Sequence, residues 1–209
     1  MQVNGLPHTT IWYDTEQQCV FIIDQTLLPF EFSTIKLNTL AEFCTAIRDM
    51  QVRGAPLIGA TAAFGLALAL HHDSSAEHEQ LAAERLIATR PTAINLRWAI
   101  DRIRTAIAPL PATEKAAHAL AVAQTIRSED ITSCEAIGSH GLTLFEQAAA
   151  KKPTGEAVNV LTHCNAGWLA TVDWGSALAP IYKAHHAGIP VHVWVDETRP
   201  RNQGASLTA

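Results

Sequence analysis

Hydrophobic and polar residues fall into blocks near the start of the chain, and the blocks differ in spacing. Two short β-prone runs at residues 10–13 and 19–23 are separated by a polar stretch, which predicts an N-terminal hairpin. Apolar side chains in residues 40–47 then recur at helical spacing. Thr39 and Glu42 stand in the register of a capping box, so the first helix is predicted to begin there.

Proline and capping residues predict the helices that follow. Pro56 occupies a position favoured in a first helical turn, and the segment after it is rich in small side chains. Ser74 and Glu77 repeat the capping-box register ahead of a third helix, and Thr92 is the predicted cap of a fourth. One or two further helices in residues 114–150 would complete a mostly helical region.

The pattern changes after residue 153. Residues 158–163 and 191–195 are compact apolar runs of strand type, and residues 176–187 between them have a helical pattern that ends at Gly188. A strand, a helix and a strand at this spacing form a βαβ unit, in which the two strands are parallel.

These elements predict an α/β protein in two parts. The first is a mostly helical N-terminal domain with a small β-hairpin, residues 1–153, and the second is the start of a parallel sheet, residues 154–209. A parallel sheet normally has several strands and is covered on both faces. Two parallel strands with open edges make a poor domain, so we expect the sheet to be incomplete and the chain to be cut short.

Composition excludes several functional classes. Of the 209 residues, 48% are hydrophobic, and the formal net charge is -5. Without a basic excess the chain lacks the electrostatic footprint of a nucleic-acid or membrane binder, so neither partner is expected. The longest uncharged run, residues 55–70, falls short of the roughly 20 residues of a membrane span and is predicted to be a buried helix.

Cysteine and histidine usage argues against metals and disulfides. The four cysteines are scattered without a CxxC spacing, which is typical of a reducing compartment. The histidines form no HExxH-like pattern, so no metal or other cofactor is expected. The first residues lack the basic and apolar regions of a secretory signal, and we therefore predict a cytoplasmic location.

Two arginines precede predicted helix starts and are candidates for binding an anion. Arg53, Gly54 and Ala55 lead into the second helix, and Arg90 comes shortly before the fourth. The first turn of a helix presents unpaired N–H groups and a partial positive charge, which suits phosphate. Gly54 would let the backbone approach an anion, and Arg53 would add a charged fork. The alternative is an ordinary helix start with a solvated arginine, and the sequence alone does not bring the two arginines together.

A third candidate segment, residues 162–167, follows the first predicted parallel strand. Open α/β sheets bind ligands beyond the carboxyl ends of their strands, so this segment and residues 196–204 should share one crevice. Cys164 lies in it, and a thiol near a helix start or a cation is suited to proton transfer. The alternative for a cysteine is a small buried hydrophobe, which we expect for Cys44 and Cys134.

Taken in order, these motifs resemble one family. The strings VRGAPLIGATAAFG, RPTAINLRWAI and LTHCNAGWLATVDWGSALAPIYKAHHAGIPVHVWVDETRPRNQGASLTA are similar to methylthioribose-1-phosphate isomerases. The wider family includes ribose-1,5-bisphosphate isomerases and regulatory subunits of the eukaryotic initiation factor 2B complex. The resemblance implies a Rossmann-like second domain. It also implies isomerisation of 5-methylthioribose 1-phosphate to 5-methylthioribulose 1-phosphate in methionine salvage.

The resemblance also implies roles for particular residues. By motif, the substrate would be held, largely through its phosphate, by Arg53, Gly54, Ala55 and Arg90, with Gln203 as a further contact. Cys164 would be the catalytic or transition-state-stabilising thiol. The family's catalytic aspartate and an Asn–Lys pair that binds substrate belong to a segment beyond Ala209, so this chain alone is expected to be inactive.

Two expectations concern partners. Family members commonly form dimers, and an intact chain is expected to be a homodimer that binds a small phosphorylated sugar. The alternative is a non-catalytic sugar-phosphate-binding module or a regulatory subunit like those of initiation factor 2B. A pure scaffold has no chemical need for the full set of motif residues, which argues against the regulatory subunit.

Overall fold

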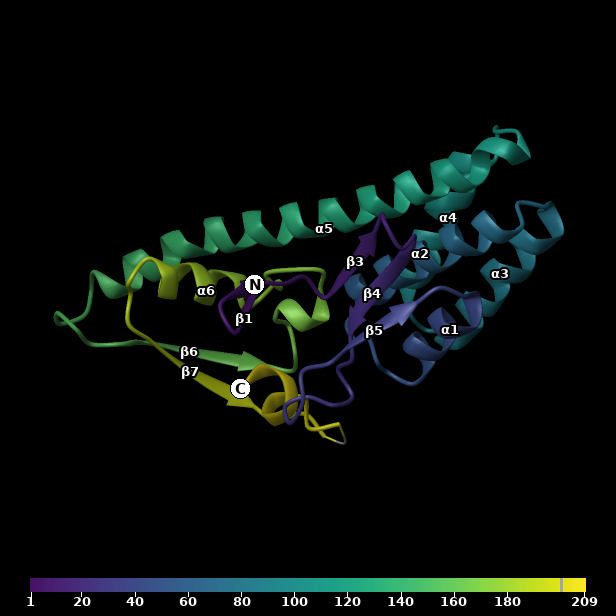
Figure 1. The fold of residues 1–209 in the computed structure, drawn as a ribbon. Helices are drawn as coiled ribbons and strands as arrows, with labels where there is room; N and C mark the ends of the chain where they lie inside the picture. Colours follow the sequence, from purple (N-terminus) through teal and green to yellow (C-terminus); the bar gives the residue numbers. More distant parts are fainter. Residues whose placement is uncertain (200) are drawn as a thin grey trace. The chain divides into compact units, whose positions relative to one another are not determined.

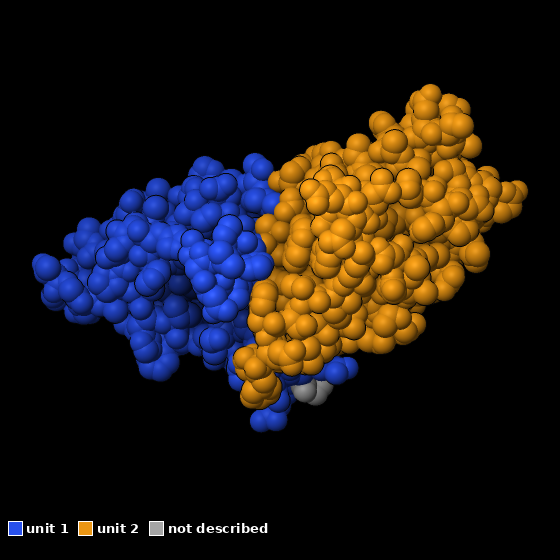
Figure 2. Space-filling view, viewed as in Figure 1, with its two compact units in different colours: residues 1–8, 130–209 blue, residues 9–129 orange. Residues whose placement is uncertain are grey.

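A computed structural model of the chain describes residues 1–199 and 201–209 (Figure 1). The chain divides into two compact units, which Figure 2 distinguishes by colour. Unit 2 is Thr9–Glu129, and unit 1 combines Met1–His8 with Asp130–Ala209. The predicted domain division near residue 153 marks where the strand-rich sequence begins, and it stays a prediction.

Unit 2 contains a three-stranded antiparallel sheet in the order β3 (Ile11–Asp14), β4 (Cys19–Ile23), β5 (Thr34–Leu37). The pairing of Ile11 with Ile22 confirms the predicted hairpin. Strand β5 was not predicted. Within it only Leu37 is buried, so the alternation that marks a half-buried strand is weak in its sequence.

Four helices complete the body of unit 2, together with the part of α5 (Ala112–Ala149) up to Glu129. They are α1 (Leu40–Arg48), α2 (Ala55–His72), α3 (Ala76–Thr89) and α4 (Ile94–Ile107). The predicted capping box is confirmed at α1, where the Thr39 hydroxyl accepts from the Glu42 N–H and the Glu42 carboxylate accepts from the Thr39 N–H.

Helix α2 is the centre of this unit, and its side chains from Leu57 to Leu70 are buried. Its small residues allow close packing: a Cβ added at Gly59 would lie 3.0 Å from the Asn95 carbonyl oxygen of α4. By length and composition alone α2 passes as a candidate membrane span, but 78% of it is buried inside the protein. The predicted buried helix is therefore confirmed.

Two predicted helix caps are wrong. Ser75, not Ser74, caps α3, because its hydroxyl accepts from the His78 N–H whereas the Ser74 hydroxyl donates back to the Leu70 carbonyl of α2. The residue at the start of α4 is Ala93, which has no side-chain oxygen, so Thr92 does not cap that helix. Residues 112–149 form one long helix, which is the first of the two predicted alternatives.

Unit 1 contains the predicted βαβ unit. Strands β6 (Val158–His163) and β7 (Val191–Asp196) are parallel, with His163 opposite Asp196, and α6 (Ala179–His186) connects them. Helix α6 begins three residues later than expected, since a loop with a bridge between Gly167 and Gly175 occupies the preceding residues. A 3₁₀ turn, η1 (Trp168–Ala170), lies within that loop. The first residues of the chain form a small two-stranded antiparallel sheet, in which β1 (Gln2–Val3) pairs with β2 (Leu6–Pro7).

The two sides of the βαβ unit differ in how they are covered. Glycines on α5 let α6 pack closely, since a Cβ at Gly141 would lie 2.4 Å from the Pro180 side chain. Two large side chains of the sheet, Leu161 and Trp194, are instead 68% and 57% exposed. Parallel sheets are normally covered on both faces, so this surface is unusual for a strand pair of this kind.

Candidate functional site

The start of α2 has the geometry expected of an anion-binding turn. Gly54 is the residue before the helix and has a φ of 87°, a conformation that glycine adopts without the clash a side chain would suffer. No side chain caps this end, and Pro56 lies in the first turn. The exposed residue Ala55 therefore presents its backbone at a helix start that carries a partial positive charge. Arg53 is half-buried beside it.

Arg90 lies at the other helix junction of unit 2. It ends α3, it is half-buried, and its carbonyl accepts from the Ala93 N–H, which turns the chain into α4. Since Gly59 in the second turn of α2 packs against Asn95 in the first turn of α4, the starts of these two helices are neighbours. The structure thus places both arginine segments at the same end of one helix pair, which the sequence could not establish.

Cys164 directly follows β6, as predicted. It has a φ of 63°, which is uncommon for a residue other than glycine, and it is half-buried. Its carbonyl oxygen accepts a hydrogen bond of 3.0 Å from the Thr208 hydroxyl. The thiol therefore belongs to a sharply turned segment at the carboxyl end of the parallel sheet, where ligands of such sheets bind.

The other three cysteines are buried and have less reactive thiols. Burial raises the pKa of Cys19 and of Cys44, and it raises the pKa of Cys134 to about 11. A thiol with a raised pKa holds little thiolate near neutral pH and reacts slowly. The expectation that Cys44 and Cys134 are packing residues is confirmed.

Gln203 lies after the second strand. It precedes a single π-helical turn, η2 (Gly204–Thr208), and is half-buried. Because Thr208 of this turn bonds to the Cys164 carbonyl, the structure brings the segments of Gln203 and Cys164 together at one edge of the sheet. The two loops lie at the same edge of the sheet, as predicted, and a shared crevice between them stays a prediction.

Two aspartates of unit 1 form close charge contacts, and one of them, Asp196, ends β7 at this edge. The Asp196 carboxylate lies 3.6 Å from His163 Nδ1, and both side chains are more than half exposed. Asp173 Oδ1 accepts from the N-terminal ammonium of Met1 at 2.6 Å and from the Trp174 N–H. Asp173 is thus already bonded to a cation, and neither carboxylate is assigned a catalytic part.

Asn165, next to Cys164, has one buried polar atom without a partner among the described residues. Its Oδ1 accepts from the Gly167 N–H, which fixes the orientation of the amide, and its Nδ2 is buried and unbonded. Nothing in the sequence singled this residue out beyond its place in the motif.

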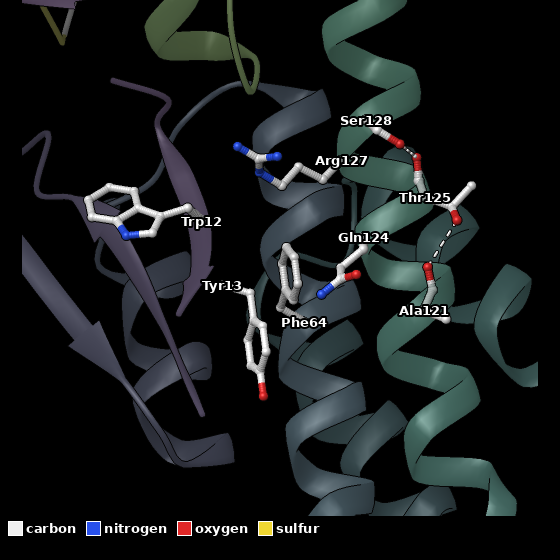
Figure 3. A pocket seen from close by; sticks show the side chains of 8 residues that line it. All are labelled: Trp12, Tyr13, Phe64, Ala121, Gln124, Thr125, Arg127 and Ser128. Carbon is white, nitrogen blue, oxygen red and sulfur yellow. Dashed lines mark hydrogen bonds between the residues drawn. The ribbon is translucent and has the colours of Figure 1, made fainter. Parts of the chain in front are cut away.

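A separate cavity of about 620 Å³ lies within unit 2 (Figure 3). Figure 3 shows aromatic side chains of β3 and α2 on one side and polar side chains of α5 on the other. Its lining consists of Trp12, Tyr13, Phe64, Ala121, Gln124, Thr125, Arg127 and Ser128. Arg127 is engaged with the backbone of β3, donating to the Ile11 carbonyl at 2.9 Å, and the described lining includes none of the predicted site residues.

Within residues 1–199 and 201–209, no three His, Cys, Asp or Glu side chains are grouped so that they could hold a metal ion. The strand ends of unit 1 offer a thiol, an amide and backbone groups. Unit 2 offers two guanidinium groups beside helix starts. Guanidinium groups and helix starts suit a phosphate, and a thiol can transfer a proton.

A known class of proteins has this arrangement, in which a helical part is followed by a parallel βαβ unit with polar residues at its strand ends. The chain belongs to the initiation factor 2 subunit family, because the sequence pattern of that family matches residues 51–209. This confirms the family resemblance of the motifs.

Individual relatives make the similarity more specific. A protein of Methylocella silvestris named methylthioribose-1-phosphate isomerase is 57% identical over 209 residues, which are 100% of this chain and 57% of that protein. Among solved structures, 5-methylthioribose 1-phosphate isomerase from Pyrococcus horikoshii is similar with a TM-score of 0.84 and 36% identity, over 97% of this chain and 56% of that one. Subunit delta of the translation initiation factor eIF-2B from A. fulgidus has a TM-score of 0.81 and 37% identity, over 97% and 58%. The chain therefore spans little more than half the length of these relatives.

Proposed function

We propose that the protein to which this chain belongs is an aldose–ketose isomerase that converts 5-methylthioribose 1-phosphate to 5-methylthioribulose 1-phosphate. The observation that carries the proposal is the position of Cys164, a half-buried thiol after β6 in a chain 57% identical to a protein named for this activity. The other three thiols lack this combination of exposure and place.

The substrate determines what the site must do. Because phosphate on O1 blocks ordinary hemiacetal opening of the ring, an acid must protonate the ring oxygen, and a hydrogen must then move from C2 to C1. Arg53, Gly54, Ala55 and Arg90 are proposed to hold the substrate, largely through its phosphate, and Gln203 to make a further contact. The uncapped start of α2 supports this assignment, since its N–H groups suit an anion.

Cys164 is proposed to act on the reacting carbons, either by transferring the proton or by stabilising the transition state. A thiol suits proton transfer when its surroundings favour the thiolate. The acid that protonates the ring oxygen is proposed to come from the part of the longer relatives that this chain does not span.

A non-catalytic role is the second candidate. The similarity to subunit delta of eIF-2B, at a TM-score of 0.81, favours a regulatory or sugar-phosphate-binding subunit. The 57% identity to the Methylocella silvestris protein over the whole chain favours the isomerase. For either candidate we propose a cytoplasmic homodimer that needs no metal and binds neither nucleic acid nor membrane.

The proposal is tested by assaying turnover of 5-methylthioribose 1-phosphate by two proteins. One is this 209-residue chain, and the other is the same chain joined to the segment that follows it in the Methylocella silvestris relative. We expect turnover from the extended protein only, and its loss in Cys164→Ser. Arg53→Lys should lower turnover by weakening the hold on the phosphate. Arg48→Lys is its matched control, because Arg48 is an exposed arginine paired with Asp49.

Each outcome distinguishes the candidates. Turnover by the short chain itself would show that the acid lies within it. An extended protein that folds and binds the sugar phosphate without converting it would favour the non-catalytic subunit. Full activity of Cys164→Ser would remove the thiol from the mechanism.

A further inference from the structure

Glu197 makes three hydrogen bonds to the loop that carries Gln203. Its Oε1 accepts from the N–H groups of Thr198 at 2.7 Å and Gly204 at 2.9 Å, and its Oε2 accepts from the Ala205 N–H at 3.2 Å. The hydrogen bond from the Thr198 N–H, with those from Gly204 and Ala205, lowers the pKa of Glu197 below its ordinary value. Through these hydrogen bonds the carboxylate holds the beginning of η2 against the end of β7.

The fit at Gly204 shows how closely this turn lies on the strand. A Cβ added there would lie 2.8 Å from the Asp196 carbonyl oxygen and 3.1 Å from Glu197 Cα. Real Cβ atoms do not approach backbone oxygens this closely, so a larger residue would push η2 away from β7. Gln203, the residue just before Gly204, is therefore held at a fixed distance from the strand end.

The other end of η2 is hydrogen-bonded to the residue that follows β6. The Thr208 hydroxyl donates to the Cys164 carbonyl oxygen at 3.0 Å. Cys164 holds a φ of 63°, and a non-glycine residue keeps such a conformation only when its surroundings restrain it. Within the turn itself, the Ser206 N–H donates to the Asn202 carbonyl and the Ala209 N–H to the Gly204 carbonyl.

We propose that Glu197 and Thr208 are positioning residues that act through η2 to hold Cys164 and Gln203 in fixed relation at the sheet edge. Neither residue needs to touch the substrate. The functional meaning of this positioning rests on the isomerase proposal, but the positioning itself is a property of unit 1 and can be measured without turnover.

The measurement is the rate at which iodoacetamide alkylates Cys164 in the 209-residue chain, followed by mass spectrometry of each cysteine peptide across a pH series. The three buried cysteines report on global unfolding in the same sample. Thr208→Val removes the hydroxyl at nearly constant volume, and Thr208→Ser restores it. Thr143→Val is the matched control, because it removes an equivalent hydroxyl bond to the His140 carbonyl, made on α5.

We expect Thr208→Val to accelerate alkylation of Cys164 by about two- to tenfold, the range given by losing one hydrogen bond that restrains a local opening. Thr208→Ser and Thr143→Val should react at the wild-type rate, and the buried cysteines should stay unreactive in all of them. Glu197→Gln, which keeps the shape of the side chain and removes its charge, should accelerate alkylation as well.

The proposal is overturned if Thr208→Val reacts like wild type, or if Thr208→Ser is as fast as Thr208→Val. If the buried cysteines of Thr208→Val become reactive, that variant has unfolded and Glu197→Gln decides instead. A wild-type alkylation rate of Cys164 in Glu197→Gln overturns the proposal, and a faster rate supports it. Because none of these readouts uses the sugar phosphate, a failed isomerase assay leaves them intact.

Discussion

Glu79 links three helices of unit 2 through two cations, and its replacement should have a pH-dependent cost. From α3 its carboxylate accepts from Arg104 Nε of α4 at 3.2 Å and from Lys115 Nζ of α5 at 2.8 Å. The Glu79 and Lys115 side chains are only 12% and 16% exposed, whereas Arg104 is 37% exposed. Glu79→Gln keeps the size of the side chain and removes the charge that both cations face.

The magnitude follows from this degree of burial. Breaking an exposed ion pair costs about 0–1 kcal/mol, and breaking a fully buried one costs about 3–5 kcal/mol. Since one cation is largely buried and the other partly solvated, we expect the free energy of unfolding of Glu79→Gln to fall by about 1–3 kcal/mol near neutral pH. Glu129→Gln is the control, because Glu129 pairs with Arg102 but is 51% exposed, and its cost should stay below about 1 kcal/mol.

The pH dependence has a definite sign. Burial alone would raise the pKa of Glu79, but hydrogen bonds and charges from Lys115 and Arg104 outweigh it, so the folded-state pKa lies below the ordinary 4.5. A carboxyl whose pKa is depressed by folding stabilises the protein fully above the unfolded-state pKa, and the contribution is lost as pH falls through the folded-state value. The difference between wild type and Glu79→Gln should therefore shrink as the pH falls below about 4.5.

Urea unfolding followed by far-ultraviolet circular dichroism, repeated at several pH values, measures this difference. A cost that is the same at neutral and at acidic pH would mean that shape, not charge, accounts for it. A cost no larger than that of Glu129→Gln would refute the argument from burial.

Three other predictions concern single sites. Near neutral pH, iodoacetamide should label Cys164 and leave Cys134 unlabelled until denaturant is added, because burial raises the pKa of Cys134 to about 11. Mass spectrometry of the cysteine peptides measures the labelling. Gly65→Ala should destabilise the chain by about 1–3 kcal/mol in urea unfolding, since the new Cβ would lie 3.0 Å from the Phe43 side chain, and an unchanged midpoint would contradict it. Thr39→Ala should lower the free energy of unfolding by about 1 kcal/mol through loss of the α1 cap, whereas Thr39→Ser should retain most of it.

Elements fixed by local patterns could be predicted from the sequence, and those fixed by distant partners could not. The hairpin and the βαβ unit follow from apolar spacing, and the capping box at Thr39 needs only its neighbours. Ser74 and Ser75 both precede α3, and which of them caps it depends on the Leu70 carbonyl to which Ser74 turns. Strand β5 was missed because its place depends on pairing with β4 rather than on its own pattern.

The candidate site shows the same division. The sequence predicts that Cys164 and Gln203 follow neighbouring parallel strands, and the structure confirms those positions, whereas their chemical roles remain proposals. The contact between Thr208 and Cys164 joins residues 44 apart in the chain, so no local pattern reveals it. The neighbouring starts of α2 and α4 likewise depend on the packing of Gly59 against Asn95.

Backbone conformation separates two of the proposed site positions in a way that bears on function. Gly54 and Cys164 both have positive φ, but only at Gly54 does the residue type suit the conformation. A left-handed conformation costs a residue with a Cβ roughly 1–2 kcal/mol relative to glycine, so stability alone would favour glycine at position 164. Cys164 therefore keeps a conformation that its residue type does not favour, and other groups must restrain the loop. The Thr208 hydroxyl supplies one such restraint, which links the chemistry proposed for Cys164 to a turn that lies beyond the next strand.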